Sequence, residues 1–423
     1  MGLTKERQIE YIDAAILWCF TGLVVVLPIA HVITVREFLI YIPVALWLCK
    51  MALKRGPVFA DNHLILPMLL FAFVAALSLF TAVDFDYSLR QFLSKLTVDF
   101  MLFFLAFNNV REIKDVRKIL FALIIGSTAQ GVYSFARFFF IDNGSLASFA
   151  VKAGGLTGGY ITYSVLIITV LPFIAYMVLT SAGGSRRLFF AALLLFNTFM
   201  LYLTFQRGAL VALFVQVMIF LGFLRRWWIC AALAAAVVLA VYALPANLVY
   251  HGSKGVDLGN EKIRDYGNTI NSRVAVWKFA LREIAEHPFK GAGLGRYSFA
   301  ARHSQFRRTD LWHAHNTFLN TAVQLGLQGL AALLFVLWRV GRTHWLGVKE
   351  SEGDARIFFM ASFVFISGFF VRNMFDDLFV DDNSEMFWFL TGLAFAVFLR
   401  FERLSYKGVF SKCPAARVKE GRE

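Results

Sequence analysis

Two histidines, His313 and His315, stand where a long polar segment meets an apolar helix, next to Trp312 and Asn316. An apolar span needs no histidine, and a neutral imidazole, whose pKa is ordinarily ~6.5, can accept a proton at working pH. The position indicates a general base. We take His315 as the base, His313 as a supporting residue, and Asn316 as a side chain that binds a hydroxyl or orients the ring. The alternative is that both histidines are amphipathic interface residues, like Trp312.

Three arginines lie at the predicted outer edge of the apolar spans. Arg207 stands in a short turn between two spans, and Arg137 stands near the end of another. Arg273 shares a helical stripe with Trp277 and Ala280, so it faces the protein body. Guanidinium groups bind phosphate oxygens in bidentate fashion and stay charged, so Arg207 and Arg273, joined by Arg137, could hold a diphosphate leaving group. The alternative for Arg207 and Arg137 is that they extend to lipid headgroups.

Acids crowd the last outer connection around an arginine and an asparagine: Arg372, Asn373, Asp376, Asp377, Asp381 and Asp382. Such carboxylates can bind Mg²⁺ or Mn²⁺, pair with arginines, position a substrate or stay solvated. We expect Asp376 and Asp382 to support the site by pairing or positioning. We expect no metal, because the sequence places no cysteine or other third ligand near His313 and His315.

The composition of the chain indicates which kind of secondary-structure element positions these residues. The chain has 423 residues, 59% of them hydrophobic and 17% charged, with a mean hydropathy of +0.64. These values exclude an ordinary soluble protein and predict an all-α polytopic integral membrane protein. Apolar runs long enough to cross ~30 Å of hydrocarbon recur along the chain. We predict about twelve transmembrane helices, at 12–31, 37–53, 64–82, 91–108, 118–140, 160–180, 187–204, 208–224, 227–245, 314–338, 356–375 and 384–400.

These spans give the predicted domain organisation. Residues 1–245 hold transmembrane helices 1–9, residues 246–313 form one large periplasmic loop, residues 314–402 hold helices 10–12, and residues 403–423 form a basic cytoplasmic tail. The loop is expected to contain an amphipathic helix near 272–287, capped by Asn271 and Ser272 and stopped by Pro288.

The net charge of +14 follows the same topology. Lysine and arginine gather in the connections of one side, which places that side and both termini in the cytoplasm. The chain has no compact basic domain, so we expect no nucleic acid as a partner. The four cysteines lie in spans or on the inner side, where no disulfide is expected.

Glycines alternate in the segment FKGAGLGRY, residues 289–297. The Rossmann spacing, the preceding strand and the following acid are all missing, so nucleotide binding is not indicated. The segment instead predicts a turn in which the backbone approaches the membrane domain closely.

Three blocks surround the large loop in a fixed order: TFQRGAL at 204–210, a stretch from Ser272 to Gly295 that ends in PFKGAGLG, and AHNTFL followed by GLQGL at 314–330. This order resembles the O-antigen ligase and polymerase superfamily of bacterial envelope enzymes. The chain departs from that pattern in two places. Gln206 stands where the family commonly has serine, and GGLTGGY at 154–160 replaces an Asn/Pro-containing segment.

The resemblance implies an O-antigen ligase, a glycosyltransferase of lipopolysaccharide biosynthesis at the periplasmic side of the bacterial cell inner membrane. Its donor would be an O-antigen glycan linked to undecaprenyl diphosphate, and its acceptor a sugar hydroxyl of the lipid A-core oligosaccharide. No metal or nucleotide cofactor is implied. His315 would match the family's essential histidine, and Arg207 and Arg273 its essential arginines.

Several alternatives remain open. An O-antigen polymerase would use another lipid-linked repeat as acceptor. An O-linked protein oligosaccharyltransferase would glycosylate a protein, but that branch often carries C-terminal domains in place of a short basic tail. A polytopic transporter or flippase would place its functional charges near the bilayer midplane, whereas the candidates here lie at the outer edge.

Overall fold

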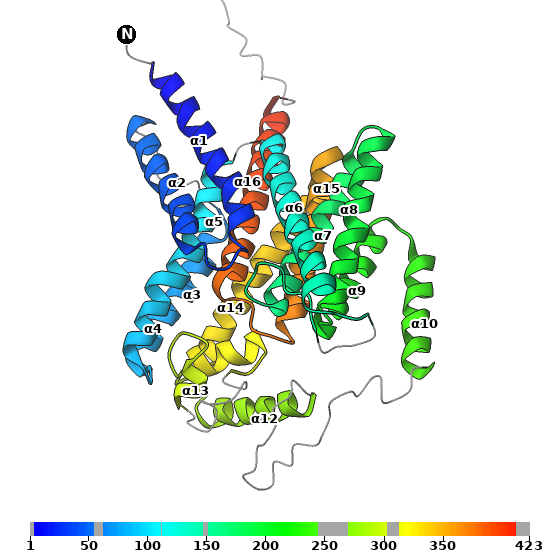
Figure 1. The fold of residues 1–423 in the computed structure, drawn as a ribbon. Coiled ribbons are helices and arrows are strands. Elements are labelled where there is room, and N and C mark those ends of the chain that lie inside the picture. The colour runs from blue at the N-terminus through cyan, green and yellow to red at the C-terminus, as the bar shows by residue number, and fades with distance from the viewer. Residues whose placement is uncertain are drawn as a thin grey trace, which may run out of the picture.

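In the computed structural model every regular element among the described residues is a helix (Figure 1). The structure describes residues 4–54, 62–110, 112–146, 151–243, 270–302 and 313–411. The all-α prediction is confirmed for these residues. The predicted loop residues 246–269 and 303–312, with Trp312 among them, and tail residues 412–423 lie outside them.

Each of the twelve predicted apolar runs overlaps a helix. The first six runs correspond to α1 (Lys5–Val26), α2 (Ile33–Lys54), α3 (Ile65–Leu77) with η1 (Ser78–Thr81), α4 (Phe85–Gln91) with η2 (Phe92–Leu96) and α5 (Thr97–Asn109), α6 (Ile113–Ala136) with η3 (Arg137–Ile141), and α7 (Tyr160–Thr180). The other six correspond to α8 (Gly184–Leu203), α9 (Arg207–Phe223), α10 (Trp227–Ala243), α14 (Thr317–Glu350), α15 (Gly353–Asn373) and α16 (Asp381–Ser411).

Length and composition identify a smaller set of membrane spans. Among the described residues, six helices are long and apolar enough to cross a membrane: α1, α6 with η3, α7, α8, α14 and α15. Two more, α3 with η1 and α9, are apolar but shorter. The chain is therefore a membrane protein, while the number twelve stays a prediction.

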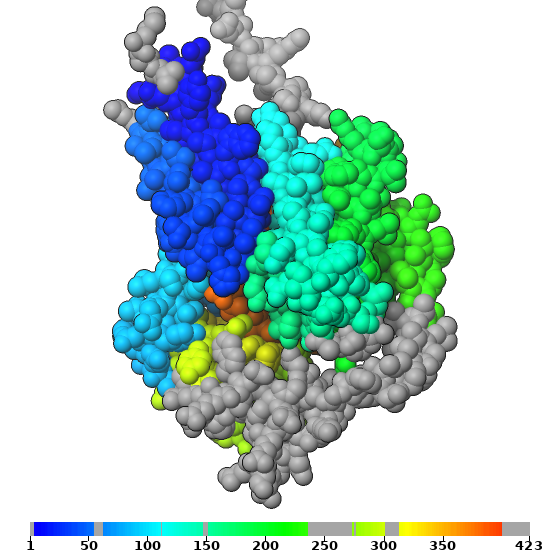
Figure 2. Space-filling view, viewed as in Figure 1, coloured from blue at the N-terminus to red at the C-terminus, as the bar shows by residue number. Residues whose placement is uncertain are grey.

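The helices pack side by side into one bundle, from α1 and α2 (blue) through α6 (cyan) to α8 (green) in the space-filling view (Figure 2). α5 packs on α16, and α15 lies between α7, α9 and α14. Phenylalanines fill these contacts. Phe103 of α5, for example, meets Trp388 and Phe395 of α16 edge-on. The close-packed bundle holds the segments at its ends in fixed positions.

One helix of this frame is interrupted near its start. Gly326 of α14 has φ 75° and ψ 179°, a conformation outside the helical region. The break leaves backbone groups that need partners inside the protein. Residues 288–293 supply them through three hydrogen bonds: Ala292 N to Val323 O at 2.9 Å, Gly293 N to Gln324 O at 3.0 Å, and Leu327 N to Pro288 O at 2.8 Å. The outer segment is thus fixed to α14.

The alternating glycines make this contact possible. Gly293 and Gly295 have φ values of 102° and 116°, and a Cβ on Gly291 would lie 2.1 Å from the Gln324 carbonyl oxygen. The predicted close approach of this turn to the membrane domain is confirmed.

The predicted amphipathic helix is α12 (Ile270–Glu286), which lies across one end of the bundle next to the short α13 (Ser298–Arg302) (Figure 1). Its Val276 and Ala280 are buried against Phe299 and the start of α14. The helix begins at Ile270, so Asn271 and Ser272 lie in its first turn, and their predicted capping position is wrong. Both residues tolerate a helix at a propensity cost of only a few tenths to ~0.7 kcal/mol.

Gly291→Ala tests how the outer segment is held. The added methyl would collide with the Gln324 carbonyl, so the turn must move and its hydrogen bonds to α14 weaken, at a cost of roughly 1–3 kcal/mol. We expect a lower unfolding temperature in detergent and faster proteolysis of residues 288–302. Gly341→Ala in α14 is the control, because nothing lies within 4 Å of its added Cβ. Equal unfolding temperatures for both variants would contradict this account.

Candidate active site

A fully buried arginine stands at the centre of the site. Arg372, in the last turn of α15, is 1% exposed. Its Nη2 lies 3.3 Å from Asp376 Oδ2 and 3.5 Å from Gln206 Oε1. A guanidinium in an apolar bundle requires such partners, because an unpaired buried charge is very costly. Sequence reasoning noted Arg372 only as a neighbour of the acids. Its place at the end of an apolar helix, four residues before Asp376, was the available signal.

Asp376 joins this arginine to a histidine. Its Oδ1 lies 3.4 Å from His315 Nδ1, and both side chains are buried. Burial raises the pKa of Asp376, but the hydrogen bond to His315 and the charge of Arg372 outweigh it, so the pKa lies below its usual range. His315 has φ 47°, a strained conformation for a non-glycine residue. The carboxylate is therefore ionised between an imidazole and a guanidinium.

His313 supports the backbone of His315. It is 3% exposed, and its Nδ1 accepts a hydrogen bond from the His315 N–H at 3.0 Å. The two rings lie 3.9 Å apart between centroids. Burial, followed by the neighbouring His315 and Arg296, lowers the pKa of His313 well below its ordinary value. His313 is thus a neutral acceptor, and its supporting role in the reaction stays a prediction.

Asp377 fixes the start of α14 to the same loop. Its two carboxylate oxygens accept from Thr317 Oγ1 at 2.9 Å and Asn320 Nδ2 at 2.6 Å. Asn320 Oδ1 in turn accepts from the Ala314 N–H at 2.8 Å. Burial raises the pKa of Asp377, opposed by the charge of Arg296. This second network holds residues 314–320 against residues 376–377.

Asn316 is the N-cap of α14. Its Oδ1 accepts from the N–H groups of Phe318 and Leu319 at 3.0 and 3.1 Å, and its Nδ2 donates to Met374 O at 3.1 Å. These bonds position the helix start and the 374–376 loop. The predicted contact of Asn316 with a hydroxyl or with the histidine ring stays a prediction.

Arg273 and Trp277 place α12 over the histidines. Arg273 Nη1 donates to Phe375 O at 2.7 Å, and Trp277 Nε1 donates to Ala314 O at 2.8 Å. The prediction that Arg273 faces the protein body is confirmed. One amphipathic helix thus contacts both segments of the site.

Arg207 begins α9 beside the same loop, with an exposed side chain. Its neighbours make the contacts. Gln206 reaches Arg372, and a Cβ on Gly208 would lie 3.2 Å from Phe375 Cβ and 3.3 Å from Arg372 Nη1. The turn before α9 therefore packs on the buried arginine, and the glutamine at the family's serine position takes part in that contact.

Two predicted residues lie elsewhere. Arg137 is bound to Asp142 at 3.1 Å and lines a separate cavity of ≈ 420 Å³ together with His31 and Lys152. Asp382, at the start of α16, pairs with Arg36. The described contacts bring neither of them to His315.

The fold also supplies a possible third metal ligand, which the sequence did not place there. His313, His315 and Asp376 each offer one ligand atom, and these atoms lie within 4.8 Å of one another. The inference that no third ligand stands near the histidines is therefore wrong, because a contact across 61 residues is not visible in local spacing. A cation here would compete with Arg372 for the carboxylate and meet the positive charge of Arg273. The set fits an imidazole–carboxylate–guanidinium chain better than a metal centre.

An imidazole beside a carboxylate, at one end of an apolar helical bundle, is an arrangement that can activate a hydroxyl. A model of the family described as O-Antigen ligase matches residues 190–334, which include Arg207, Arg273 and His315. This segment is a domain of the O-antigen ligase family, and the predicted resemblance is confirmed. The match supports an O-antigen ligase/polymerase-type glycosyltransferase domain in this segment. A search of curated proteins finds no match.

The Asp376→Asn variant tests the buried contacts that join His315, Asp376 and Arg372. Because the folded-state pKa of Asp376 is lowered, its pairing stabilises the protein fully above the unfolded pKa of ~3.9 and is lost only as the pH falls through the lower folded value. We expect Asp376→Asn to cost about 3–5 kcal/mol at every pH from 5 to 8, since it strands Arg372.

Asp381→Asn is the matched control for this measurement. Its side chain is 63% exposed beside Lys95, and an exposed pair is worth only ~0–1 kcal/mol. Thermal unfolding of both variants across this pH range gives the comparison. Equal losses in the two variants would contradict the central place of Asp376.

Proposed function

We propose that this protein is an O-antigen ligase. It transfers a glycan from undecaprenyl diphosphate to a sugar hydroxyl of the lipid A-core oligosaccharide. The observation that carries the proposal is the His315–Asp376 contact at 3.4 Å, with its histidine inside the segment that matches the O-antigen ligase family. Base and orienting carboxylate are the first requirements of hydroxyl activation.

His315 is the general base of the proposed reaction. Asp376 favours the tautomer with the proton on Nδ1, which leaves the Nε2 lone pair to accept the hydroxyl proton of the acceptor. The acceptor oxygen forms a bond to the anomeric carbon while the bond from that carbon to the diphosphate oxygen breaks. The electron pair leaves with undecaprenyl diphosphate, and direct displacement inverts the anomeric centre. General-base help of this kind is worth roughly 10²–10⁴-fold.

Arg207 and Arg273 stabilise the departing diphosphate. Support comes from their placement, because α12 and the turn before α9 both pack against residues 372–375. Charge that develops on the leaving group is best met by fixed cations. Arg372 is too buried to touch a substrate, so it positions Asp376. Arg137 lines another cavity, so any role for it concerns a more distant part of the donor.

We further infer that this site faces the periplasm from the bacterial inner membrane, with both termini in the cytoplasm. Support comes from the positions of charge. α1 begins at the end of the bundle opposite α12 (Figure 1), and the basic connections of the sequence are expected at that same end. A transporter is disfavoured, because these charged candidates gather at one end of the bundle.

The closest rival is an O-antigen polymerase, which the family match also covers. Both reactions need the same base and the same diphosphate site, and they differ only in the acceptor. An O-linked protein oligosaccharyltransferase differs in the same way. The acceptor is therefore the property that decides between them.

His315→Ala should reduce transfer by at least about 10²-fold while expression and unfolding temperature stay near those of the wild type, because the base is lost. Transfer is measured with purified protein, undecaprenyl diphosphate-linked glycan and lipid A-core. His287→Ala is the matched control, since His287 is exposed at the end of α12. A near-normal rate in His315→Ala would exclude histidine as the base.

Transfer should also survive removal of metal ions. We expect the same rate after dialysis against EDTA, because the imidazole, carboxylate and guanidinium groups perform the proposed steps. Metal content and rate are measured on the same sample. A rate that falls with EDTA and returns with Zn²⁺ or Mn²⁺ would instead assign His313, His315 and Asp376 to a metal.

A further inference from the structure

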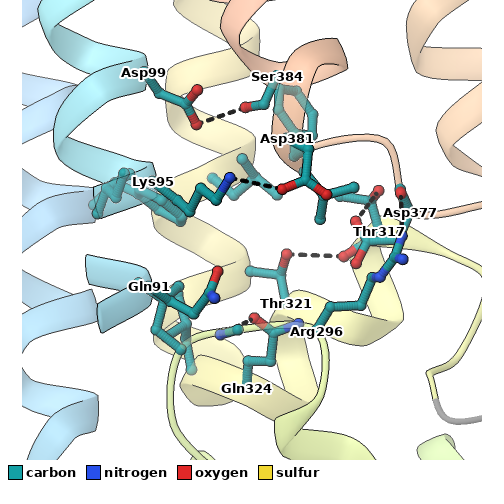
Figure 3. A pocket seen from close by; sticks show the side chains of 18 of the residues that line it. Gln91, Lys95, Asp99, Arg296, Thr317, Thr321, Gln324, Asp377, Asp381 and Ser384 are labelled. Carbon is teal, nitrogen blue, oxygen red and sulfur yellow. Dashed lines mark hydrogen bonds and ion pairs between the residues drawn. The ribbon is translucent and has the colours of Figure 1, made fainter. Parts of the chain in front are cut away.

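A polar cavity of ≈ 210 Å³ adjoins the candidate active site (Figure 3). It lies between α4, η2 and the start of α5 on one side and the starts of α14 and α16 on the other. Thr317 and Asp377 belong to its wall. These two residues also hold the loop of Asp376 against the segment of His315. The cavity is therefore joined to the catalytic chain by shared residues.

Hydrogen-bond donors and acceptors both line this cavity (Figure 3). Donors come from Gln91, Lys95, Arg296, Thr321, Gln324 and Ser384, and carboxylate acceptors from Asp99, Asp377 and Asp381. Two of these groups already meet within the wall, Ser384 Oγ donating to Asp99 at 2.6 Å and Lys95 pairing with Asp381 at 2.8 Å. A hydroxyl is both donor and acceptor, so a polyhydroxylated ring can use both kinds of group. A diphosphate has no donor to offer and would meet three carboxylates. The lining thus favours a neutral sugar over an anion.

The remaining lining suits a sugar ring as well. Tyr87, Trp388 and Phe71 present apolar surface to the cavity, and amphipathic aromatics cover the C–H face of such a ring while their polar ends stay bonded. Tyr87 Oη, for example, accepts from the Tyr297 N–H at 3.2 Å. The volume is below the roughly 300–1,000 Å³ of drug-sized sites. It therefore suits one ring and not a chain of several.

The cavity is lined by α4, η2 and α14, whereas Arg207 begins α9 and Arg273 belongs to α12. α3 and α4 stand on one side of α14, and α9 and α15 stand on the other (Figure 1). The adjacent residues Asp376 and Asp377 contact different groups. Asp376 pairs with Arg372 and His315, whereas Asp377 lines the cavity. In a direct displacement the nucleophile enters opposite the leaving group. A ring in the cavity, held by elements other than α9 and α12, would suit the nucleophile.

We propose, building on the proposed function, that this cavity binds a sugar ring of the acceptor glycan next to the hydroxyl that attacks. Gln91, Lys95 and Asp99 come from helices outside the segment that matches the ligase family. The acceptor wall is therefore shared between that segment, which supplies Arg296, Thr321 and Gln324, and helices outside it. Acceptor specificity can vary in this chain while the reaction residues stay in place.

Lys95→Met and Gln91→Leu test the proposal. The probe is the delipidated core oligosaccharide, and its affinity for the purified protein is measured by titration calorimetry. Loss of a hydrogen bond to a charged group should weaken binding by about 10-fold or more, and loss of one to the neutral amide by several-fold. The KM for lipid A-core should rise by similar factors, with kcat and the affinity for undecaprenyl diphosphate unchanged.

Arg90→Met is the matched control, because Arg90 is an exposed residue of α4 that does not line the cavity. His315→Ala should lose transfer and keep the oligosaccharide affinity. If the wild type transfers glycan and both cavity variants bind the probe like the wild type, the cavity assignment is overturned and the ligase proposal stands. The cavity assignment is also overturned if the cavity variants bind the probe like the wild type but bind undecaprenyl diphosphate-linked glycan more weakly. If the wild type binds the probe but transfers nothing, the ligase proposal fails.

Discussion

The need to pair one buried guanidinium organises this site. Arg372 is carried into the bundle by α15, and an uncompensated charge there would cost several kcal/mol. Its partners come from separate parts of the chain, Gln206 from the turn before α9 and Asp376 from the loop before α16. Because Asp376 also meets His315, the pairing that satisfies Arg372 also sets the orientation of the proposed base. The Asp376 carboxylate therefore both pairs with the buried guanidinium and orients the proposed base.

The break in α14 complements this pairing. An uninterrupted helix would satisfy its own backbone, and the outer segment would have nothing to hold. With Gly326 outside the helical region, residues 288–293 complete the hydrogen bonding of α14. That attachment sets where α12 lies, and α12 carries Arg273 to the loop of Asp376. The same stretch of α14 begins at the Asn316 cap beside His315. The proposed base and Arg273 are therefore both positioned by one interrupted helix.

The sequence predicted much of this arrangement, but it did not predict that Asp376 contacts both Arg372 and His315. Hydropathy located a helix at every apolar run, and the stripe of Arg273, Trp277 and Ala280 predicted the buried face of α12. The glycine turn at 289–297 was also predicted, since alternating glycines permit close backbone contact. Asp376 and Arg372 were visible only as a charged cluster, because their pairing with His315 spans 61 residues and depends on tertiary packing. The lining of the polar cavity next to the site is assembled from elements that include α4, η2, α5, α14 and α16, and no local pattern brings these elements together.

The central claim concerns the acceptor, and reconstitution tests it most directly. The wild-type protein is placed in liposomes with undecaprenyl diphosphate-linked glycan, lipid A-core and lipid-linked repeat offered together, and the products are resolved by mass and by the anomeric configuration of the new bond. The account predicts glycan joined to the lipid A-core through an inverted linkage. Extension of the lipid-linked repeat with an unmodified core, or retention of the anomeric configuration, would contradict it.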